Sequence, residues 1–203
     1  RTSFLGASDG VAETNRGRIR AARTIVCVGH DLDYLFPKLA AEREVQRCGL
    51  QMMRVVAPEG LQLAPVVLTG TSMLRYPAFA GTDAAARLSG EIAPALLDIG
   101  ANVMFTQRPD GTLIVGDSHR YDATMDPFQA EETSALLLAE ISRILGVPTL
   151  TVIERWQGIY ASSPLQSFLV AEVAPGVTVA SVTSGVGMTI SLGLAEKTLN
   201  ALV

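Results

Sequence analysis

The sequence predicts an α/β fold, with some α+β character, in which a layer of buried, parallel-type strands is interrupted by an inserted, mainly antiparallel sheet. Short apolar runs rich in β-branched residues stand near both ends of the chain, at 24–28 and 177–183. Such runs are typical of strands buried on both faces. Between residues 49 and 116 the strand-like runs change character and include a hairpin signal, which favours a separate antiparallel sheet.

The composition is that of an ordinary folded protein: 203 residues, of which 48% are hydrophobic and 18% are charged. A chain of this length can bury a sizeable core. The formal net charge of −4 argues against a nucleic-acid partner, because general nucleic-acid binders carry a basic face. The sequence has no apolar run of about 18 residues, so no membrane span is expected.

The two cysteines, Cys27 and Cys48, do not form a C-x-x-C motif, and no histidine is placed to complete a metal set. We therefore expect no metal site and two free, buried thiols in a reducing, cytoplasmic compartment. The chain begins with Arg1 and not with Met, and we interpret it as a piece of a longer polypeptide.

The first third of the chain predicts strands followed by a partly helical segment. Residues 17–29 indicate a short strand, a break, and a buried strand at 24–28 that ends at Gly29. Residues 31–47 carry helical spacing in part. Pro37 can occupy a first helical turn or interrupt the run.

The middle of the chain predicts a mainly antiparallel sheet and one long helix. Runs at 50–58, 63–74 and 101–117 indicate strands, and Asp110-Gly111 supplies the positive-φ turn of a hairpin. Residues 127–146 predict a helix that begins at Pro127 and ends before Gly146 and Pro148. Strands near 149–154, 166–172 and 177–183 follow, and then a final helix.

Four segments, in matching order and spacing, carry a resemblance to a known family. They are AARTIVCVGHDLDYLFP at 21–37, GTLIVGDSHRYD at 111–122, ERWQGIYASSP at 154–164 and VTSGVGMTISLGLAEKTL at 182–199. Together they resemble the D-amino-acid oxidase-like (DAO) flavoproteins. The pairing of GDSHRYD with RWQGIYAS is most similar to a bacterial subgroup linked to aminophosphonate breakdown.

The resemblance implies a Rossmann-like FAD-binding layer, incomplete here, with an inserted substrate-binding sheet. Residues 1–48 would be part of the FAD-binding domain, 49–153 the substrate-binding domain, and 154–203 a C-terminal FAD-binding segment. The family's phosphate-binding G-x-G-x-x-G is absent from the chain. The family places that motif upstream of the 24–28 strand, so we expect the sequence to be truncated at its N-terminus.

The resemblance also implies which residues contact FAD. In this family the C-terminal loop and the following helix N-terminus lie against the pyrimidine end of the flavin, where the reduced ring carries negative charge. Backbone N–H groups and a helix dipole would stabilise that charge. The cofactor-binding residues expected here are Gly29, Gly158, Ser184, Gly185, Val186, Gly187, Met188 and Thr189. The alternative is a plain strand-to-helix connection capped by Ser184 or Thr189.

Three residues are candidates for catalysis. His119 and Arg120 follow the predicted strand at 113–116; His119 could hold a neutral amine or accept its proton, and Arg120 could pair an anion. The alternative is that both are solvated loop residues. The family's carboxylate-pairing Arg in W-x-G-x-R-P is Tyr160 here, which could donate its O–H to an anionic substrate or serve as an inward aromatic.

Two functions from different classes follow. The first is an FAD-dependent oxidoreductase that oxidises a small amine or amino-acid-like substrate, including one of aminophosphonate type, by hydride transfer to the flavin. Its partner would then be a small-molecule amine substrate, and assembly into a homo-oligomer is compatible with the sequence. The alternative is a non-catalytic fragment or binding module of the same fold without the cofactor.

Overall fold

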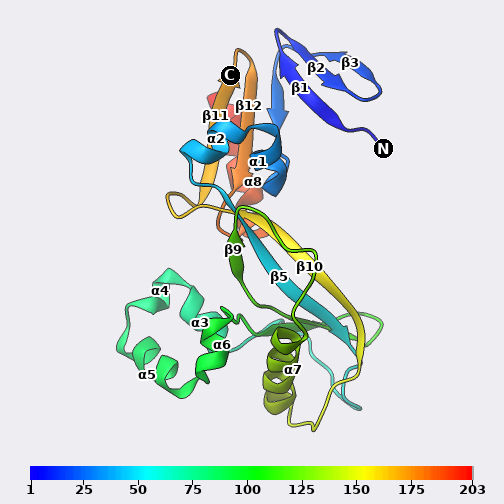
Figure 1. The fold of residues 1–203 in the computed structure, drawn as a ribbon, viewed down its shortest axis with the longest axis vertical. Coiled ribbons are helices and arrows are strands. Elements are labelled where there is room, and N and C mark those ends of the chain that lie inside the picture. The colour runs from blue at the N-terminus through cyan, green and yellow to red at the C-terminus, as the bar shows by residue number, and fades with distance from the viewer. Residues whose placement is uncertain (203) are drawn as a thin grey trace. The chain divides into compact units, whose positions relative to one another are not determined.

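The computed structural model describes residues 1–202, which form two compact units (Figure 1). Unit 1 consists of Arg1–Cys48, Tyr121–Thr124 and the chain from Ile159 onward. Unit 2 consists of Gly49–Arg120 and Met125–Gly158. Among the described residues, none of the helices combines the length and the apolar character that crossing a membrane requires.

Unit 1 holds two three-stranded sheets. One is an antiparallel meander, and the other has the order β11-β12-β4. β12 pairs with β11 antiparallel and with β4 parallel, so the two predicted end strands do share one layer. The strands are β1 (Phe4–Ser8), β2 (Val11–Thr14), β3 (Gly17–Arg20), β4 (Thr24–Val26), β11 (Phe168–Ala174) and β12 (Val177–Val182).

The β1–β2 hairpin is missing from the sequence-based prediction, although its signal is present. Asp9 and Gly10 have φ of 49° and 72°, as a type I′ turn requires at both central positions. This is the same Asp-Gly signal that predicts the hairpin at 110–111. β4 is also shorter than predicted, because it ends at Val26 and not at residue 28. It is not buried on both faces, because Ile25 is 38% exposed, and of the two cysteines only Cys48 is buried, whereas Cys27 is exposed.

The helices of unit 1 follow β4 and β12. The predicted 31–47 segment is broken into short pieces, because Pro37 starts a new helix after Phe36 takes a non-helical φ of −134°. The pieces bury Leu32 and Leu39 against Val26 and Val179. These helices are η1 (Gly29–Asp31), α1 (Leu32–Leu35) and α2 (Pro37–Glu42), and the C-terminal helix is α8 (Gly187–Ala201).

Unit 2 is built on a sheet with the order β10-β5-β8-β7-β6, with β9 paired to β5. β7 and β8 form the predicted antiparallel hairpin around Asp110-Gly111, with Gly111 at a φ of 84°. The predicted strand at 63–74 is wrong except at Val67–Leu68, because residues 63–66 are irregular and a helix begins at Gly70. The strands are β5 (Gln46–Val55), β6 (Val67–Leu68), β7 (Met104–Gln107), β8 (Leu113–Gly116), β9 (Arg120–Asp122) and β10 (Val152–Ser162).

Four short helices and one long helix complete unit 2. The long one ends as predicted, with Gly146 in the left-handed conformation at a φ of 69°. It begins later than predicted, with Ala130 at its N-cap, so Pro127 lies outside its first turn. The helices are α3 (Gly70–Arg75), α4 (Pro77–Ala80), α5 (Asp83–Glu91), α6 (Pro94–Asp98) and α7 (Glu131–Leu145).

The two faces of the unit 2 sheet differ. Met53 of β5 and Val115 of β8 are fully buried with Leu137 of α7 in one hydrophobic core. The alternate residue Met52 points the other way and covers Gly116, where a Cβ would collide with its sulfur. The strand pleat therefore separates an α7-covered face from a second, only half-buried face.

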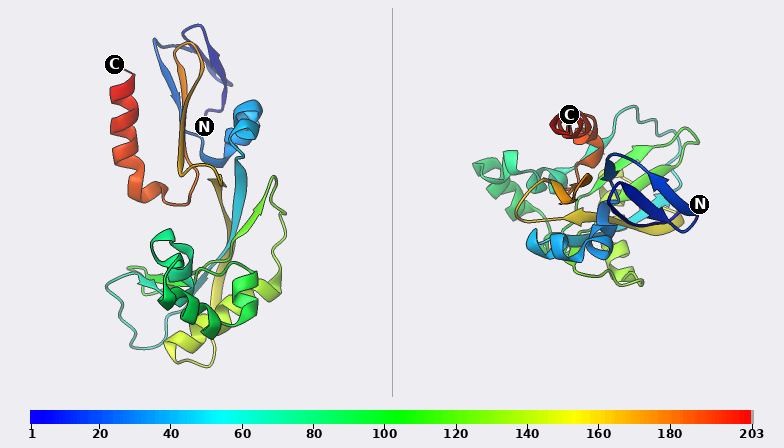
Figure 2. Two further views of the ribbon diagram at one scale, coloured as in Figure 1. Left: turned by 90° about the vertical axis from the view of Figure 1, so that its left-hand side faces the viewer. Right: turned by 90° about the horizontal axis from the view of Figure 1, so that it is seen from above.

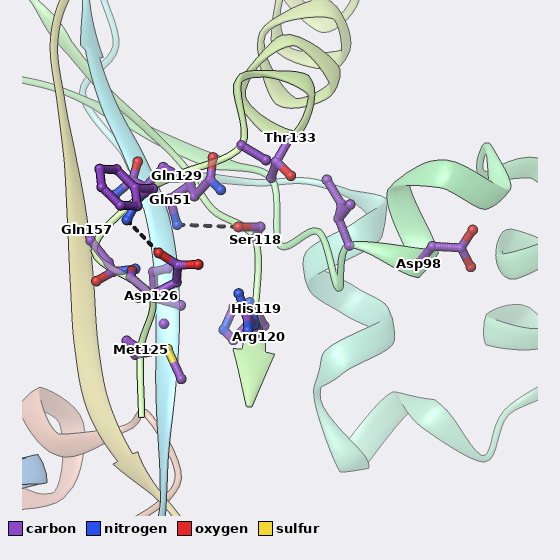
Figure 3. A pocket seen from close by; sticks show the side chains of 15 residues that line it. Gln51, Asp98, Ser118, His119, Arg120, Met125, Asp126, Gln129, Thr133 and Gln157 are labelled. Carbon is purple, nitrogen blue, oxygen red and sulfur yellow. Dashed lines mark hydrogen bonds between the residues drawn. The ribbon is translucent and has the colours of Figure 1, made fainter. Parts of the chain in front are cut away.

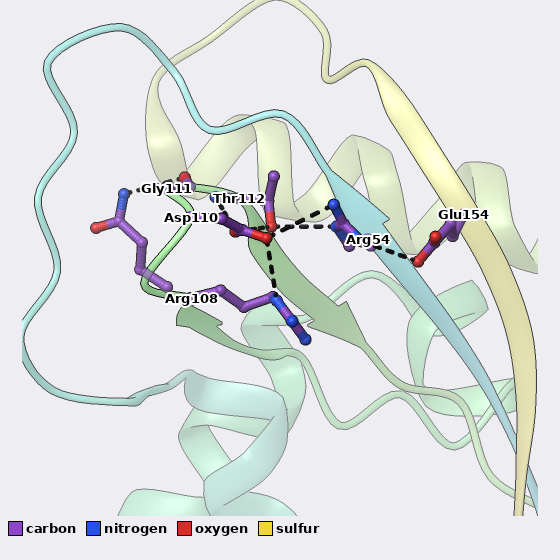
Figure 4. Close-up of polar contacts among 7 residues, drawn as sticks. Arg54, Arg108, Asp110, Gly111, Thr112 and Glu154 are labelled. Atoms are coloured by element: carbon purple, nitrogen blue, oxygen red, sulfur yellow. Dashed lines mark hydrogen bonds and ion pairs between the residues drawn. The ribbon is translucent and has the colours of Figure 1, made fainter.

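A polar cluster joins the hairpin turn to the neighbouring strands (Figure 4). Arg54 of β5 donates Nε to Thr112 Oγ1 at 3.2 Å and approaches Glu154 of β10 at 3.3 Å and Asp110 at 3.6 Å. Asp110 accepts hydrogen bonds from the Thr112 N–H and hydroxyl, which, with help from Arg108, lower the pKa of its carboxyl. The cluster fixes the turn to the sheet.

Candidate functional site

The predicted catalytic pair lies at a cavity of about 540 Å³ within unit 2 (Figure 3). Its wall comes from β5, the loop after β8, β10 and the segment that leads into α7. More than half of the lining residues are polar or charged. They include Gln51, Ser118, His119, Arg120, Asp126, Gln129, Thr133 and Gln157. We refer to this space as the His119 cavity.

Hydrogen bonds between elements hold the wall of the His119 cavity in place. Ser118 accepts the Gln51 backbone N–H at 3.3 Å, and Gln51 Oε1 accepts the Ser134 hydroxyl of α7 at 3.1 Å. On the opposite side, Gln157 Nε2 donates to the Asp126 carbonyl at 3.2 Å. The polar groups that face the cavity are therefore positioned before a ligand arrives.

His119 is a buried hydrogen-bond acceptor at neutral pH. Its side chain is only 5% exposed, and burial, reinforced by the Arg75 cation, lowers its pKa to about 4. Nδ1 lies 3.2 Å from the Gly100 carbonyl oxygen. A carbonyl can only accept, so Nδ1 carries the proton and Nε2 of the neutral ring keeps its lone pair.

Asp117 lies next to His119 and was not identified from the sequence as a site residue. Burial raises its pKa to about 6, against the opposing effects of an Asn102 hydrogen bond and of Arg75. Asp117 Oδ1 lies 3.6 Å from His119 Nδ1, but the two do not form an ion pair at pH 7, because the imidazole is neutral. Among the described residues, Asp117 Oδ1 and Asn102 Oδ1 are buried without a hydrogen-bond partner.

The predicted cofactor loop lies in unit 1, where its stem is held by side chains. Thr183 donates Oγ1 to the Gln166 carbonyl at 2.6 Å, and Ser184 donates Oγ to the Ser167 carbonyl at 2.9 Å. Val186 is the N-cap of α8, and no side chain caps the helix. The alternative of capping by Ser184 or Thr189 is therefore wrong.

The backbone amides of this loop are mostly uncommitted. Across residues 1–202, the N–H groups of Val186, Gly187 and Met188 donate to no acceptor of the protein, whereas the Gly185 amide lies at the isolated antiparallel bridge between Ser162 and Ser184. The Thr189 amide differs, because it donates to the Val186 carbonyl at 3.0 Å. Three successive donors, Val186 to Met188, thus gather at the positive end of a 15-residue helix.

Tyr160 lies against this loop within unit 1, and not at the His119 cavity. Its hydroxyl shares hydrogen bonds with the Cys48 thiol and the Tyr121 hydroxyl, and burial, with these partners, holds its pKa well above the usual range. A Cβ on Gly185 would stand 3.2 Å from the Tyr160 ring. The structure therefore groups Tyr160 with the cofactor loop.

Two other predicted cofactor residues have different surroundings. Gly29 and Gly187 line an apolar cavity of about 450 Å³ between the β4–β12 strands and α8, which we call the α8 cavity; Figure 2 shows α8 alongside β12. Gly158 packs against Leu50 in unit 2, where a Cβ would stand 3.3 Å from the leucine side chain. The described residues hold no group of three or more metal-ligating side chains.

Comparisons with known proteins agree with this architecture. A family model described as DAO, FAD dependent oxidoreductase, matches residues 2–200. No curated protein sequence matches the chain.

The chain also resembles solved structures at low sequence identity. L-proline dehydrogenase from P. horikoshii aligns with a TM-score of 0.70 and 13% identity over 100% of this chain and 49% of that one. Iminodiacetate oxidase from Chelativorans sp. BNC1 aligns with a TM-score of 0.66 and 17% identity, over 98% of this chain and 47% of that one. Glycine oxidase from Geobacillus kaustophilus aligns with a TM-score of 0.64 and 16% identity, over 96% of this chain and 46% of that one. The chain thus spans about half the length of these proteins and shares their fold.

Proposed function

Because the chain belongs to the DAO family of FAD-dependent oxidoreductases, we propose that it forms part of an enzyme that oxidises a small amine or amino-acid-like substrate. The observation that carries the proposal is the set of three amides, at residues 186–188, that have no acceptor at the N-terminus of α8. Such donors favour an electron-rich group. In a non-catalytic module the same donors would be left to water.

The residues present fit one end of FAD. When bound, FAD accepts the hydride that leaves the carbon next to the amine nitrogen. The amides of residues 186–188 would donate to the pyrimidine edge of the ring, and the left-handed Gly185 leaves room for close approach. The chain contains no G-x-G-x-x-G to hold the pyrophosphate, so the proposal includes a further segment that supplies it.

The α8 cavity supports the idea of a further segment. β4 is an edge strand in a parallel pair, and parallel strands are normally covered on both faces and paired on both sides. Leu192 of α8 is 86% exposed and Leu199 is 52% exposed. Apolar surface of this kind is stabilised when another element covers it.

The His119 cavity is the proposed substrate site. With a pKa of about 4, His119 is too weak a base to take a proton from an ammonium group at pH 7. It would instead accept a hydrogen bond from the amine N–H and orient it. Arg120 is exposed at the edge of the cavity and would pair with an acid group on the substrate, carboxylate or phosphonate.

The test uses the full-length protein loaded with FAD. Flavin reduction is measured anaerobically with an amino acid, an aminophosphonate and an uncharged amine. Arg120→Ala should raise KM about fivefold for the acid-bearing amines, because an exposed ion pair is worth about 1 kcal/mol. KM for the uncharged amine should not change.

Arg87→Ala is the matched control, because it removes an exposed arginine of unit 2 that does not line the cavity. Full-length protein that fails to bind FAD, or that binds it and is reduced by none of the amines, would favour the non-catalytic module. Equal losses for charged and uncharged amines in the Arg120 variant would refute anion pairing.

A further inference from the structure

The Tyr160 ring and the Gly185 backbone are in close contact inside unit 1. A Cβ on residue 185 would stand 3.2 Å from Cζ and 3.3 Å from the hydroxyl oxygen of Tyr160. Gly185 also has a φ of 74°, a conformation that side-chain-bearing residues rarely adopt. Glycine at 185 therefore meets two requirements at once: the turn of the backbone and the room for the ring.

The hydroxyl of Tyr160 already has partners in the protein. It shares hydrogen bonds with Cys48, which is fully buried at the start of β5, and with Tyr121 of β9. These bonds tie the ring to the unit 1 ends of β5 and β9. A hydroxyl engaged on both sides is poorly placed to donate to a substrate anion as well.

The loop itself has few other supports beyond its stem. Thr183 and Ser184 are held by the carbonyls of Gln166 and Ser167. An isolated antiparallel bridge also joins Ser184 to Ser162. From Val186 to Met188 no backbone amide donates to the described protein, and the Met188 side chain is 99% exposed. The direction in which these amides point therefore depends on what packs against Gly185.

We propose that Tyr160 is a positioning residue, which holds the 184–188 segment so that its uncommitted amides converge on the flavin, and that it does not bind substrate. The flavin part rests on the function proposed above, whereas the support of the loop does not. The ring packs against Gly185, and hydrogen bonds to Cys48 and Tyr121 hold the ring in place. Removal of the ring should free the loop, and removal of the hydroxyl alone should loosen it only partly.

The first measurement needs no cofactor: hydrogen exchange of the Thr189 and Ile190 amides, which both donate to the Val186 carbonyl. Tyr160→Ala should speed their exchange about tenfold or more, and Tyr160→Phe should retain most of the protection. Met188→Ala is the control, because it truncates an exposed side chain of the same segment. Gly185→Ala tests the same contact from the other side and should also speed exchange.

The second measurement uses the full-length, FAD-loaded protein. Tyr160→Ala should weaken FAD binding about tenfold and move the flavin reduction potential to a more negative value, because donors to the reduced ring are lost. Tyr160→Phe should restore most of both and leave KM for an acid-bearing amine unchanged.

The outcomes separate the two proposals. Unchanged exchange in both Tyr160→Ala and Gly185→Ala would overturn the positioning role and leave the proposed function intact. Faster exchange with unchanged FAD affinity and potential would support the positioning of the loop and refute its contact with the flavin. A KM increase in Tyr160→Phe, without a change in exchange, would assign Tyr160 to the substrate and overturn the inference.

Discussion

Asp117 and His119 should give unit 2 two opposite pH dependences that nearly cancel, and replacing either one should reveal the other. Burial raises the pKa of Asp117 from 3.8 to about 6 and lowers that of His119 from 6.5 to about 4. Both side chains are less than a tenth exposed, so solvent does little to screen these effects. One pKa unit corresponds to about 1.4 kcal/mol between the two protonation states.

The sign differs for the two groups. The folded protein binds the Asp117 proton more tightly than the unfolded chain, so this group stabilises below pH 3.8 and loses about 3 kcal/mol as the pH rises to about 6. The folded protein disfavours the His119 proton, so this group stabilises above pH 6.5 and loses about 3 kcal/mol as the pH falls to about 4. In the wild type the two contributions nearly cancel, so their summed effect on the free energy of unfolding changes little between about pH 4 and neutral pH.

Asp117→Asn should therefore make unit 2 less stable by about 3 kcal/mol on going from neutral pH to about pH 4, because only His119 then titrates. His119→Gln should make it more stable by a similar amount over the same window. Urea unfolding reports on this directly, because the only tryptophan, Trp156, lies on β10 in unit 2. Asp98→Asn, an exposed aspartate at the same cavity, controls for the change in net charge. Parallel pH profiles for the wild type and both variants would refute the reasoning.

Two further predictions concern stability. Asp33→Asn should cost about 1–2 kcal/mol at neutral pH, because Arg47 donates Nε and Nη2 to this half-buried carboxylate at 2.6 and 2.7 Å. Its hydrogen bonds to Arg47 lower the pKa of Asp33, so the loss should shrink as the pH falls below 3.8; a pH-independent cost in urea unfolding would contradict it. Leu137→Ala should lower the free energy of unfolding by about 2–5 kcal/mol, because Leu137 is fully buried in the core under α7. Leu97→Ala should lower it by much less in the same urea unfolding assay, because Leu97 is half-exposed. Equal losses for the two variants would contradict this placement of the core.

Local signals in the sequence were sufficient for the strands that contain them. The β-branched runs at β4 and β12 and the Asp110-Gly111 turn correspond to observed elements, because burial of a strand and a positive-φ turn each require particular residue types. α3 to α6 were not predicted, because four to nine residues are too few for a helical period to emerge. Pro77 and Pro94, each in a first turn, were the available signal.

The candidate site was predictable only where its residues are adjacent in the sequence. His119 and Arg120 were singled out together, and the structure places both at one cavity. The polar side chains that surround this pair were not predicted. Arg75 and Asn102 come close to Asp117 and His119 only because α3 packs near the end of β8. A side chain of ordinary sequence context becomes a perturbed acid when tertiary structure buries it, and no local pattern records that.

The parallel pairing of β4 with β12 has a consequence for how the protein is made. Thr24 pairs with Val177, so about 150 residues of synthesis separate the two partners. A ribosome that adds about 5–20 residues per second leaves β4 waiting roughly 8–30 s for β12 to emerge. The apolar residues Ile25 and Val26 stay unpaired for that time, whereas the β7–β8 hairpin closes as soon as its turn has been translated. Unit 1 therefore leaves an apolar strand without its partner for much longer than the β7–β8 hairpin of unit 2 does.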